Sequence, residues 1–467
     1  MNTHILSKID SLIKESRQEL ADLTKKLVNI KSVLEPAAPG APFGEGVKKV
    51  LDTAVMLGKE KGLFTQDYNV GVVSIALKEG QPDLGIWVHG DVVPEGTGWS
   101  FEPYNAVEYE GRIVGRGAGD NKGQLAAMLI LLDIFKKLDI KLKYTPALYI
   151  GSNEEKGMLE LLGMEGNPDA KGFLNLCTPP KMSLVPDGAF PVGYGGKGNL
   201  MLMLKTVKPL KGLRVIAGQD DAPGKAVAVF ENRVTGNFKE CTVTYGKNTT
   251  VEISSLPVHN AKPVPGGNMI TTLARELIAS GVLDGEDIPM FDFLQKMSAD
   301  TTGSMFGIDV ETNTMAPLSV STFKIDDIDG CMQVNINIRY PIEITAEEII
   351  ERITRVSGLY GFVFSDKNII HKPYLLDKDS EIVKTLCRVS NDVTGMDQTP
   401  YTVQGGTYAH ELPNAYVFGS SANLRPESWE APRGSAHSID EVVSLDRLQR
   451  AMKIYARALL ELNEKEW

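Results

Sequence analysis

The chain has 467 residues, and its 49 Lys and Arg against 60 Asp and Glu give a formal net charge of −11. A hydrophobic content of 42% and a charged content of 23% are typical of globular proteins, so the composition excludes disordered, collagen-like and disulfide-scaffold proteins. The length predicts two or three domains, and an acidic chain without a basic block predicts no nucleic-acid partner.

The first elements in chain order predict a repeated succession of strand, polar residue and helix. Apolar residues at helical spacing over residues 8–31 predict an amphipathic opening helix. Short apolar runs at residues 84–88, 144–150 and 182–185 predict buried strands, and each run ends in polar residues of the kind that bind metals. The apolar segment 121–138 predicts a helix. This succession indicates an α/β sheet with a site along its strand ends.

From about residue 194 the pattern changes to that of an α+β insertion. Alternation with period two at residues 241–253 and 332–338 predicts strands, and residues 269–279 and 346–356 predict helices. Helical patterning returns at residues 380–393 and 444–463, with an apolar strand at 415–418. We therefore predict an α/β domain over residues 1–193 and 374–467, split by a second domain over residues 194–373.

The cysteines and the N-terminus predict the compartment. The four cysteines are far apart and include no CxxC pair, which favours free, mostly buried thiols over zinc fingers or disulfides. The first twenty residues carry charges every few positions, unlike a signal peptide. No apolar stretch approaches the ~18 residues of a membrane span. We expect a cytoplasmic protein that makes no membrane contact.

Two motifs in the first half contain residues that can bind metal. His89 ends a predicted strand, and the nearby Asp91 could fix its tautomer. An isolated match of this kind is more often a structural histidine, by about three to one. Asp120 lies in a glycine-rich turn before an apolar helix and could bridge two cations. Taken alone, Asp120 is better explained as a helix N-cap.

Three further motifs continue the series. Glu154 and Glu155 follow a predicted strand, where adjacent carboxylates repel each other unless a cation or proton is present. Asp187 lies in a Pro-Asp-Gly turn, and His437 in a Gly/Ser loop before the last helix. Each has a plain alternative as a solvated turn or loop. Together they form the ligand set of a two-metal hydrolytic site that suits zinc, manganese or cobalt.

These motifs in this order resemble a known family. HGDVVP, GDNKG, NEEKG, PDG and the late His437 resemble the dinuclear metallopeptidases of the aminoacylase, glutamate carboxypeptidase and dipeptidase superfamily. The sequences around Tyr194, Arg339 and Gly405 further resemble the PepV-type dipeptidases, including the manganese-dependent Sapep-type members. The resemblance covers essentially the whole chain. It implies a zinc-peptidase-like catalytic domain, with a mostly parallel mixed sheet flanked by helices, interrupted by an α+β lid domain.

The resemblance implies a role for each matching residue. His89 and Asp187 would bind one metal, Glu155 and His437 the other, and Asp120 would bridge them. The same resemblance makes Glu154 the general base and Asp91 the residue that orients His89. The residues implied to contact the substrate are the lid histidine His259 at the scissile carbonyl, and Arg339, Gly405, Gly406 and Thr407 at the terminal carboxylate.

Three positions depart from the family pattern. Asn153 stands where Asp usually precedes the Glu pair, and Asp440 stands where Asn usually precedes the last Glu. Asp220 stands at an Asn position of the lid, where an acidic residue would repel an anionic substrate. These departures bear on the choice of substrate more than on metal chemistry.

The resulting prediction is a metal-dependent dipeptidase with two divalent cations per chain, zinc or manganese, and a dipeptide as its substrate. An N-acyl amino acid deacylase would use the same metals. A catalytically inactive binding protein on this scaffold is a weaker alternative, because all five ligands and the base are present. A purely structural α/β protein would bind no stoichiometric metal. The sequence is compatible with a monomer or a homodimer.

Overall fold

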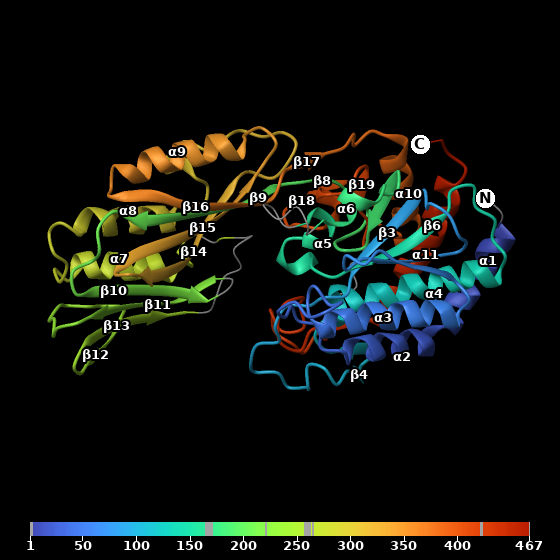
Figure 1. Cartoon of the computed structure of the whole chain (residues 1–467), viewed down its shortest axis with the longest axis horizontal. Coiled ribbons are helices and arrows are strands. Elements are labelled where there is room, and N and C mark those ends of the chain that lie inside the picture. The colour runs from blue at the N-terminus through green and yellow to red at the C-terminus, as the bar shows by residue number, and fades with distance from the viewer. Residues whose placement is uncertain are drawn as a thin grey trace. The chain divides into compact units, whose positions relative to one another are not determined.

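The computed structural model describes residues 3–163, 171–219, 222–255, 263, 266–420 and 424–466. The chain forms two compact units. The first comprises Met1–Gly195, Leu376–Val403 and Thr407–Trp467, and the second comprises Gly196–Leu375 with Gln404–Gly406. Figure 1 shows a mixed sheet with helices in the first unit and an antiparallel sheet with helices in the second.

The first unit is built on a mixed sheet with the strand order β1-β2-β6-β3-β7-β19-β8, and β18 pairs with β8. The four strands β6, β3, β7 and β19 are parallel neighbours, so their carboxyl ends meet at one edge. A small sheet has the order β20-β5-β4. The strands of this unit are β1 (Phe64–Asp67), β2 (Val73–Ala76), β3 (Leu84–His89), β4 (Val107–Tyr109), β5 (Arg112–Val114), β6 (Pro146–Gly151), β7 (Met182–Val185), β8 (Gly193–Gly196), β18 (Tyr401–Val403), β19 (Ala415–Val417) and β20 (Val442–Ser444).

Helices cover this sheet. The apolar helix α4 packs against β3 and β6, and also against α11. Every residue from Gly123 to Phe135 in α4 is buried, which explains why its sequence lacks a polar face. The helices of this unit are α1 (Thr3–Glu15), α2 (Arg17–Val28), α3 (Glu45–Glu60), α4 (Gly123–Lys137), α5 (Leu159–Leu162), α6 (Phe173–Leu176), α10 (Glu381–Thr394) and α11 (Leu445–Leu462), with the short turns η1 (Ala118–Lys122), η2 (Glu154–Lys156) and η4 (Tyr408–His410).

The opening segment differs from the single helix predicted over residues 8–31, because α1 ends before Ser16 and α2 begins after it. The hydroxyl of Ser16 donates to the carbonyl of Ile13 at 2.9 Å. Such side-chain hydrogen bonds to the backbone compete with the helical pattern and interrupt it.

The central strands are buried on both faces, as their continuous apolar runs predict. All six residues of β3 and all six of β6 are buried. Between these strands the rings of Trp87 and Tyr149 stack with their centroids 4.3 Å apart. This stacked pair packs the two strands together just before the residues that follow them. The predicted strands at 84–88, 144–150, 182–185 and 415–418 are confirmed within one or two residues.

The second unit is an antiparallel sheet with the order β12-β13-β11-β10-β14-β15-β9-β16. Helix α7 packs against α8, β11 and β13, and α9 packs against β16 (Figure 1). Its elements are β9 (Gly198–Thr206), β10 (Leu213–Gln219), β11 (Ala222–Phe230), β12 (Thr242–Tyr245), β13 (Thr249–Ser254), α7 (Met269–Ala279), α8 (Ile288–Ala299), η3 (Ser304–Phe306), β14 (Ser319–Ile328), β15 (Cys331–Tyr340), α9 (Ala346–Gly358), β16 (Phe362–His371) and β17 (Tyr374–Leu375).

Several predictions for the second unit are confirmed. Helix α7 has the predicted bounds, and α9 begins at the predicted residue, Ala346, behind a capping box of Thr345 and Glu348. There Glu348 N–H donates to Thr345 Oγ1 at 3.2 Å and Thr345 N–H donates to Glu348 Oε2 at 3.0 Å. The stretch 241–253 is a hairpin of two strands rather than one strand.

Two predictions about the whole chain can be compared with the described residues. All four cysteines are free, but only Cys331 is buried, so the prediction of mostly buried thiols is wrong. The other three thiols lie in partly exposed positions at Cys177, Cys241 and Cys387. Within the described ranges, no helix is both long and apolar enough to cross a membrane.

Candidate metal centre

Three neighbouring parallel strands carry candidate ligands at their carboxyl ends. His89 is the last residue of β3, Glu155 lies in the short turn η2 just after β6, and Asp187 follows β7 by two residues. Because β6, β3 and β7 are parallel and adjacent, their ends meet at one edge of the sheet. The fold therefore brings together residues that are far apart in the sequence.

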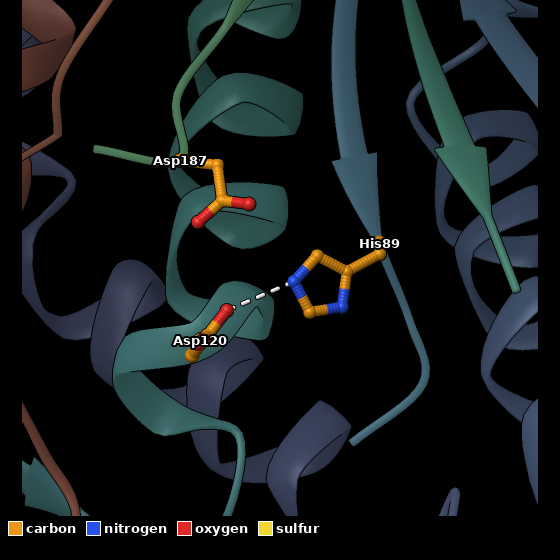
Figure 2. A group of neighbouring side chains, drawn as sticks. All are labelled: His89, Asp120 and Asp187. Atoms are coloured by element: carbon orange, nitrogen blue, oxygen red, sulfur yellow. Dashed lines mark hydrogen bonds and ion pairs between the residues drawn. The ribbon is translucent and has the colours of Figure 1, made fainter. Parts of the chain in front are cut away.

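Asp120 reaches the same edge from a different element. It lies in the turn η1, where its backbone angles of φ −142° and ψ 88° depart from helical values. Its Oδ1 atom lies 2.9 Å from Nε2 of the buried His89. Figure 2 shows His89, Asp120 and Asp187 facing one another, and their ligand atoms lie within 4.8 Å of each other. The three side chains form a first candidate cation site.

A second candidate site uses the other oxygen of Asp120. His437 Nε2 lies 3.2 Å from Asp120 Oδ2 and 3.1 Å from Glu155 Oε2. The ligand atoms of Asp120, Glu155 and His437 also lie within 4.8 Å of one another. Asp120 thus directs one carboxylate oxygen toward each histidine, which is the arrangement expected of a bridging ligand.

Burial and crowding shift the pKa values of the carboxylates. Burial, and then the charge of Asp187, raise the pKa of Glu154 well above its ordinary value. Burial and the charge of Asp120 raise the pKa of Asp187 to about 7. Nearby charges also shift the pKa of the histidine His437 to about 12, against the effect of burial, and Glu155 contributes most to this rise.

Burial and the charges of the cluster cause these shifts together. The cluster confines the four partly buried acidic side chains of Asp120, Glu154, Glu155 and Asp187 with only two imidazoles, so like charges repel. A divalent cation would relieve that repulsion more than a proton does. Imidazole nitrogen and carboxylate oxygen are ligands that zinc, manganese and cobalt accept. The donor set therefore fits two divalent cations.

Asp91 connects the end of β3 to the turn after β6. Its carboxylate accepts the backbone N–H groups of Glu154 at 3.3 Å and of Glu155 at 3.1 Å. Its Oδ1 lies 3.5 Å from Nδ1 of His89, and its backbone carbonyl lies 3.0 Å from the same nitrogen. Asp91 is buried, so these contacts fix both the imidazole and the glutamate pair.

A hydrogen bond also links the loops of Asp120 and Asp187. The side-chain amide of Asn121 donates to the backbone carbonyl of Pro186 at 3.3 Å. The neighbouring Lys122 is fully buried and donates to the carbonyl of Ile30 at 2.7 Å. Burial lowers the pKa of Lys122 to about 7. These contacts anchor the Asp120 turn to the body of the first unit.

No motif in the sequence marks the buried pair of Glu160 and Tyr408. Tyr408 donates from its hydroxyl to Glu160 Oε1 at 2.5 Å, and the N–H of Ser152 donates to the same oxygen at 3.3 Å. Both side chains are buried, and burial raises the pKa of Glu160 to about 7. The signal in the sequence was limited to an acidic residue in an otherwise apolar short helix.

Two departures from the family pattern have structural roles. Asn153 is buried, and its Oδ1 accepts the N–H of Leu159 at 3.1 Å. Asp440 is fully buried and accepts hydrogen bonds from Ser100 N–H at 2.8 Å and Arg433 Nε at 2.8 Å. Asp220 lies outside the described residues.

The residues predicted to bind substrate do not all belong to the first unit. His259 lies outside the described residues. Arg339 belongs to the second unit, on β15, and its Nε donates to Asn337 Oδ1 at 3.3 Å. Gly405 and Gly406 are grouped with the second unit, whereas Thr407 belongs to the first and caps η4 by accepting the N–H of Ala409. Their contribution to substrate binding stays a prediction.

Comparisons with known proteins show which chains this one resembles. The chain is 28% identical over 472 residues to "Putative dipeptidase YtjP" of Bacillus subtilis strain 168, covering 96% of this chain and 97% of that one. It resembles the structure of the di-peptidase Dug1p from Saccharomyces cerevisiae, with a TM-score of 0.62, 15% identity and complete coverage of both chains. For human carnosine dipeptidase 1 the TM-score is 0.59 at 15% identity, over 98% of this chain and 100% of that one. The model of Peptidase family M20/M25/M40 matches residues 85–461, and the chain belongs to this family.

Proposed function

We propose that this protein is a metal-dependent dipeptidase that hydrolyses dipeptides with two divalent cations, zinc or manganese. The observation that carries the proposal is the shared position of Asp120, which belongs both to the group with His89 and Asp187 and to the group with Glu155 and His437. A structural turn or an N-cap would not need a histidine at each carboxylate oxygen. The relatives that are named dipeptidases favour this substrate class.

We assign five residues to the cations. His89 and Asp187 would hold one, Glu155 and His437 the other, and Asp120 both. When bound, the two cations would supply positive charge that lowers the pKa of a water and polarises the scissile carbonyl. Cobalt accepts the same ligands and serves as a probe in vitro.

Glu154 is the proposed general base. Glu154 is partly buried, and burial together with the charge of Asp187 raises the pKa of its carboxyl, the direction that favours proton transfer by a general base. It would take a proton from the attacking water and return one to the leaving amine. The carboxylate of Asp91 would keep Glu154 in place, because it accepts the backbone N–H of Glu154.

The substrate is proposed to be held by Arg339, by residues 405–407 and by His259. The guanidinium of Arg339 can donate two parallel hydrogen bonds to a terminal carboxylate. Gly405, Gly406 and Thr407 would contribute to the same contact, and His259 would stabilise the oxyanion that forms at the scissile carbonyl.

The test uses metal-stripped protein reloaded separately with Zn²⁺, Mn²⁺ or Co²⁺. Each form is assayed against a panel of dipeptides and against N-acetyl and N-succinyl amino acids. The proposal predicts two bound ions per chain and turnover of dipeptides well above that of the acyl amino acids. Preferred turnover of the acyl amino acids would assign a deacylase instead, and the absence of stoichiometric metal would exclude a hydrolytic centre.

A further inference from the structure

Glu441 lies beneath the turn that carries Asp120. Its Oε1 accepts the backbone N–H groups of Gly119 at 2.8 Å and of Asp120 at 2.9 Å. Its Oε2 accepts the N–H of Gly117 at 3.0 Å and Nη1 of Arg116 at 2.6 Å. The side chain is fully buried, so these four hydrogen bonds replace its hydration completely.

The backbone of Glu441 also continues the loop that carries His437. The two residues are four positions apart, and the backbone carbonyl of Glu441 accepts the N–H of Gly115 at 2.9 Å. In the same loop, Gly434 N–H donates to the carbonyl of Ile439 at 3.0 Å. His437 has a φ of +61°, a conformation that a non-glycine residue adopts only when its surroundings hold it. One residue thus connects the His437 loop to the Asp120 turn.

The first candidate site has supports of its own. His89 is the end of a buried strand, and Asp91 contacts its Nδ1. The turn before Asp187 receives the hydrogen bond from Asn121. Neither of these contacts involves Glu441. The two sites therefore depend on Glu441 unequally, because only in the second do two ligands, Asp120 and His437, rely on it.

We propose that Glu441 is a positioning residue that holds Asp120 and His437 in register and so determines whether the second cation binds. The inference rests on the proposed dinuclear function. In Glu441→Gln an NH₂ group would replace one of the two carboxylate oxygens. The two donors that now bind that oxygen would then face another donor instead of an acceptor. One side of the Asp120 turn would lose its acceptor, while His89 and Asp187 would keep their contacts.

The matched control is Asp440→Asn. Asp440 is the adjacent residue and equally buried, but its carboxylate accepts hydrogen bonds from Ser100, Phe101 and Arg433 rather than from the Asp120 turn. It tests the effect of disturbing a buried acidic residue in the same loop. Thermal unfolding of each variant shows whether the fold is retained.

The experiment titrates metal-stripped wild-type protein and both variants with Mn²⁺ by calorimetry, and records the electron paramagnetic resonance spectrum of each. We expect two Mn²⁺ ions and a spin-coupled pair in the wild type and in Asp440→Asn. In Glu441→Gln we expect one ion to bind with affinity within about threefold of the wild type, the second at least tenfold more weakly, and the spectrum of isolated Mn²⁺.

Other results separate the two proposals. Two tightly bound ions with a coupled spectrum in Glu441→Gln would overturn the role of Glu441 and leave the dinuclear proposal intact. Equal weakening of both ions in Glu441→Gln would also overturn it. Fewer than two ions in the wild type would contradict the dinuclear function itself. If Glu441→Gln does not fold, Arg116→Lys applies the same test, because it weakens one of the four contacts and should selectively weaken the second ion.

Discussion

Asp91 accepts a hydrogen bond from the backbone N–H of Glu155, with 3.1 Å between its Oδ2 and the nitrogen. The two residues follow neighbouring parallel strands, and the same carboxylate contacts His89 on its other side. Asp91 therefore helps to fix the distance between His89 and Glu155, which are proposed ligands of different cations. Residues that orient metal ligands in this way affect metal affinity and activity although they do not bind the metal.

Replacing Asp91 with Asn should weaken the site. The amide can accept from only one of the two backbone N–H groups, and it presents donors to the other. We expect a loss of about 10–100-fold in metal affinity or activity, the usual effect of removing such a contact. Metal titration and steady-state kinetics measure both. Asp52→Asn, at an exposed position of α3, is the control, and an equal effect in both variants would contradict the assignment.

Glu154→Gln should abolish most turnover without loss of metal. The amide cannot accept a proton, so kcat should fall by about 10²–10⁴-fold, the range of general acid–base catalysis. Elemental analysis should still find two ions per chain. Glu155→Gln is the contrasting variant, because it removes a proposed ligand and should lower the metal content. Wild-type kcat in Glu154→Gln would show that the base is another residue.

The sequence predicts the strand ends well because of how parallel sheets are buried. Strands β3, β6 and β7 are mostly apolar and buried along their whole length, and polar residues follow where the strands end. Helix α3 was not predicted, because Gly44 at its N-cap provides no side-chain cap. Strands such as β14 were missed because polar residues are buried among the apolar ones, which hides the period-two pattern.

Glu160→Gln should change how stability depends on pH. Burial raises the pKa of Glu160 to about 7, above its ordinary 4.5, so the folded state binds this proton more tightly than the unfolded state. The stabilisation is present below pH 4.5 and is lost as the pH rises to about 7. The glutamine side chain of the variant has no such proton to lose.

The measurement is the free energy of unfolding of both proteins from pH 5 to pH 8 at one saturating metal concentration. The variant should gain stability relative to the wild type as the pH rises. A difference that is constant across this range would show that Glu160 does not titrate there.

Gly151→Ala should destabilise the first unit. An added Cβ would lie 1.9 Å from the hydroxyl oxygen of Tyr408 and 2.7 Å from Glu160 Oε1, and both side chains are buried. Overpacking of this kind costs about 1–3 kcal/mol. Gly285→Ala is the control, since no atom lies within 4 Å of its added Cβ. Urea unfolding compares the two, and equal midpoints would contradict the described packing.

The candidate site was predictable only in part. The residues at strand ends stand in recognisable motifs, because each is a polar residue that directly follows a buried apolar run. The pair of Glu160 and Tyr408 has no such mark, since the hydrogen bond between residues 248 positions apart exists only after folding. Glu441 is the last Glu of the family pattern, but the role of its side chain could not be predicted, since its four donors lie more than 300 residues earlier in the chain.

The most direct test of the dinuclear centre is a crystal structure of the Mn²⁺-loaded protein with anomalous diffraction data. We predict two anomalous peaks per chain, one among His89, Asp120 and Asp187 and the other among Asp120, Glu155 and His437. Asp120 should contact both ions, one with each carboxylate oxygen. A single peak, or two peaks that do not share Asp120, would contradict the account.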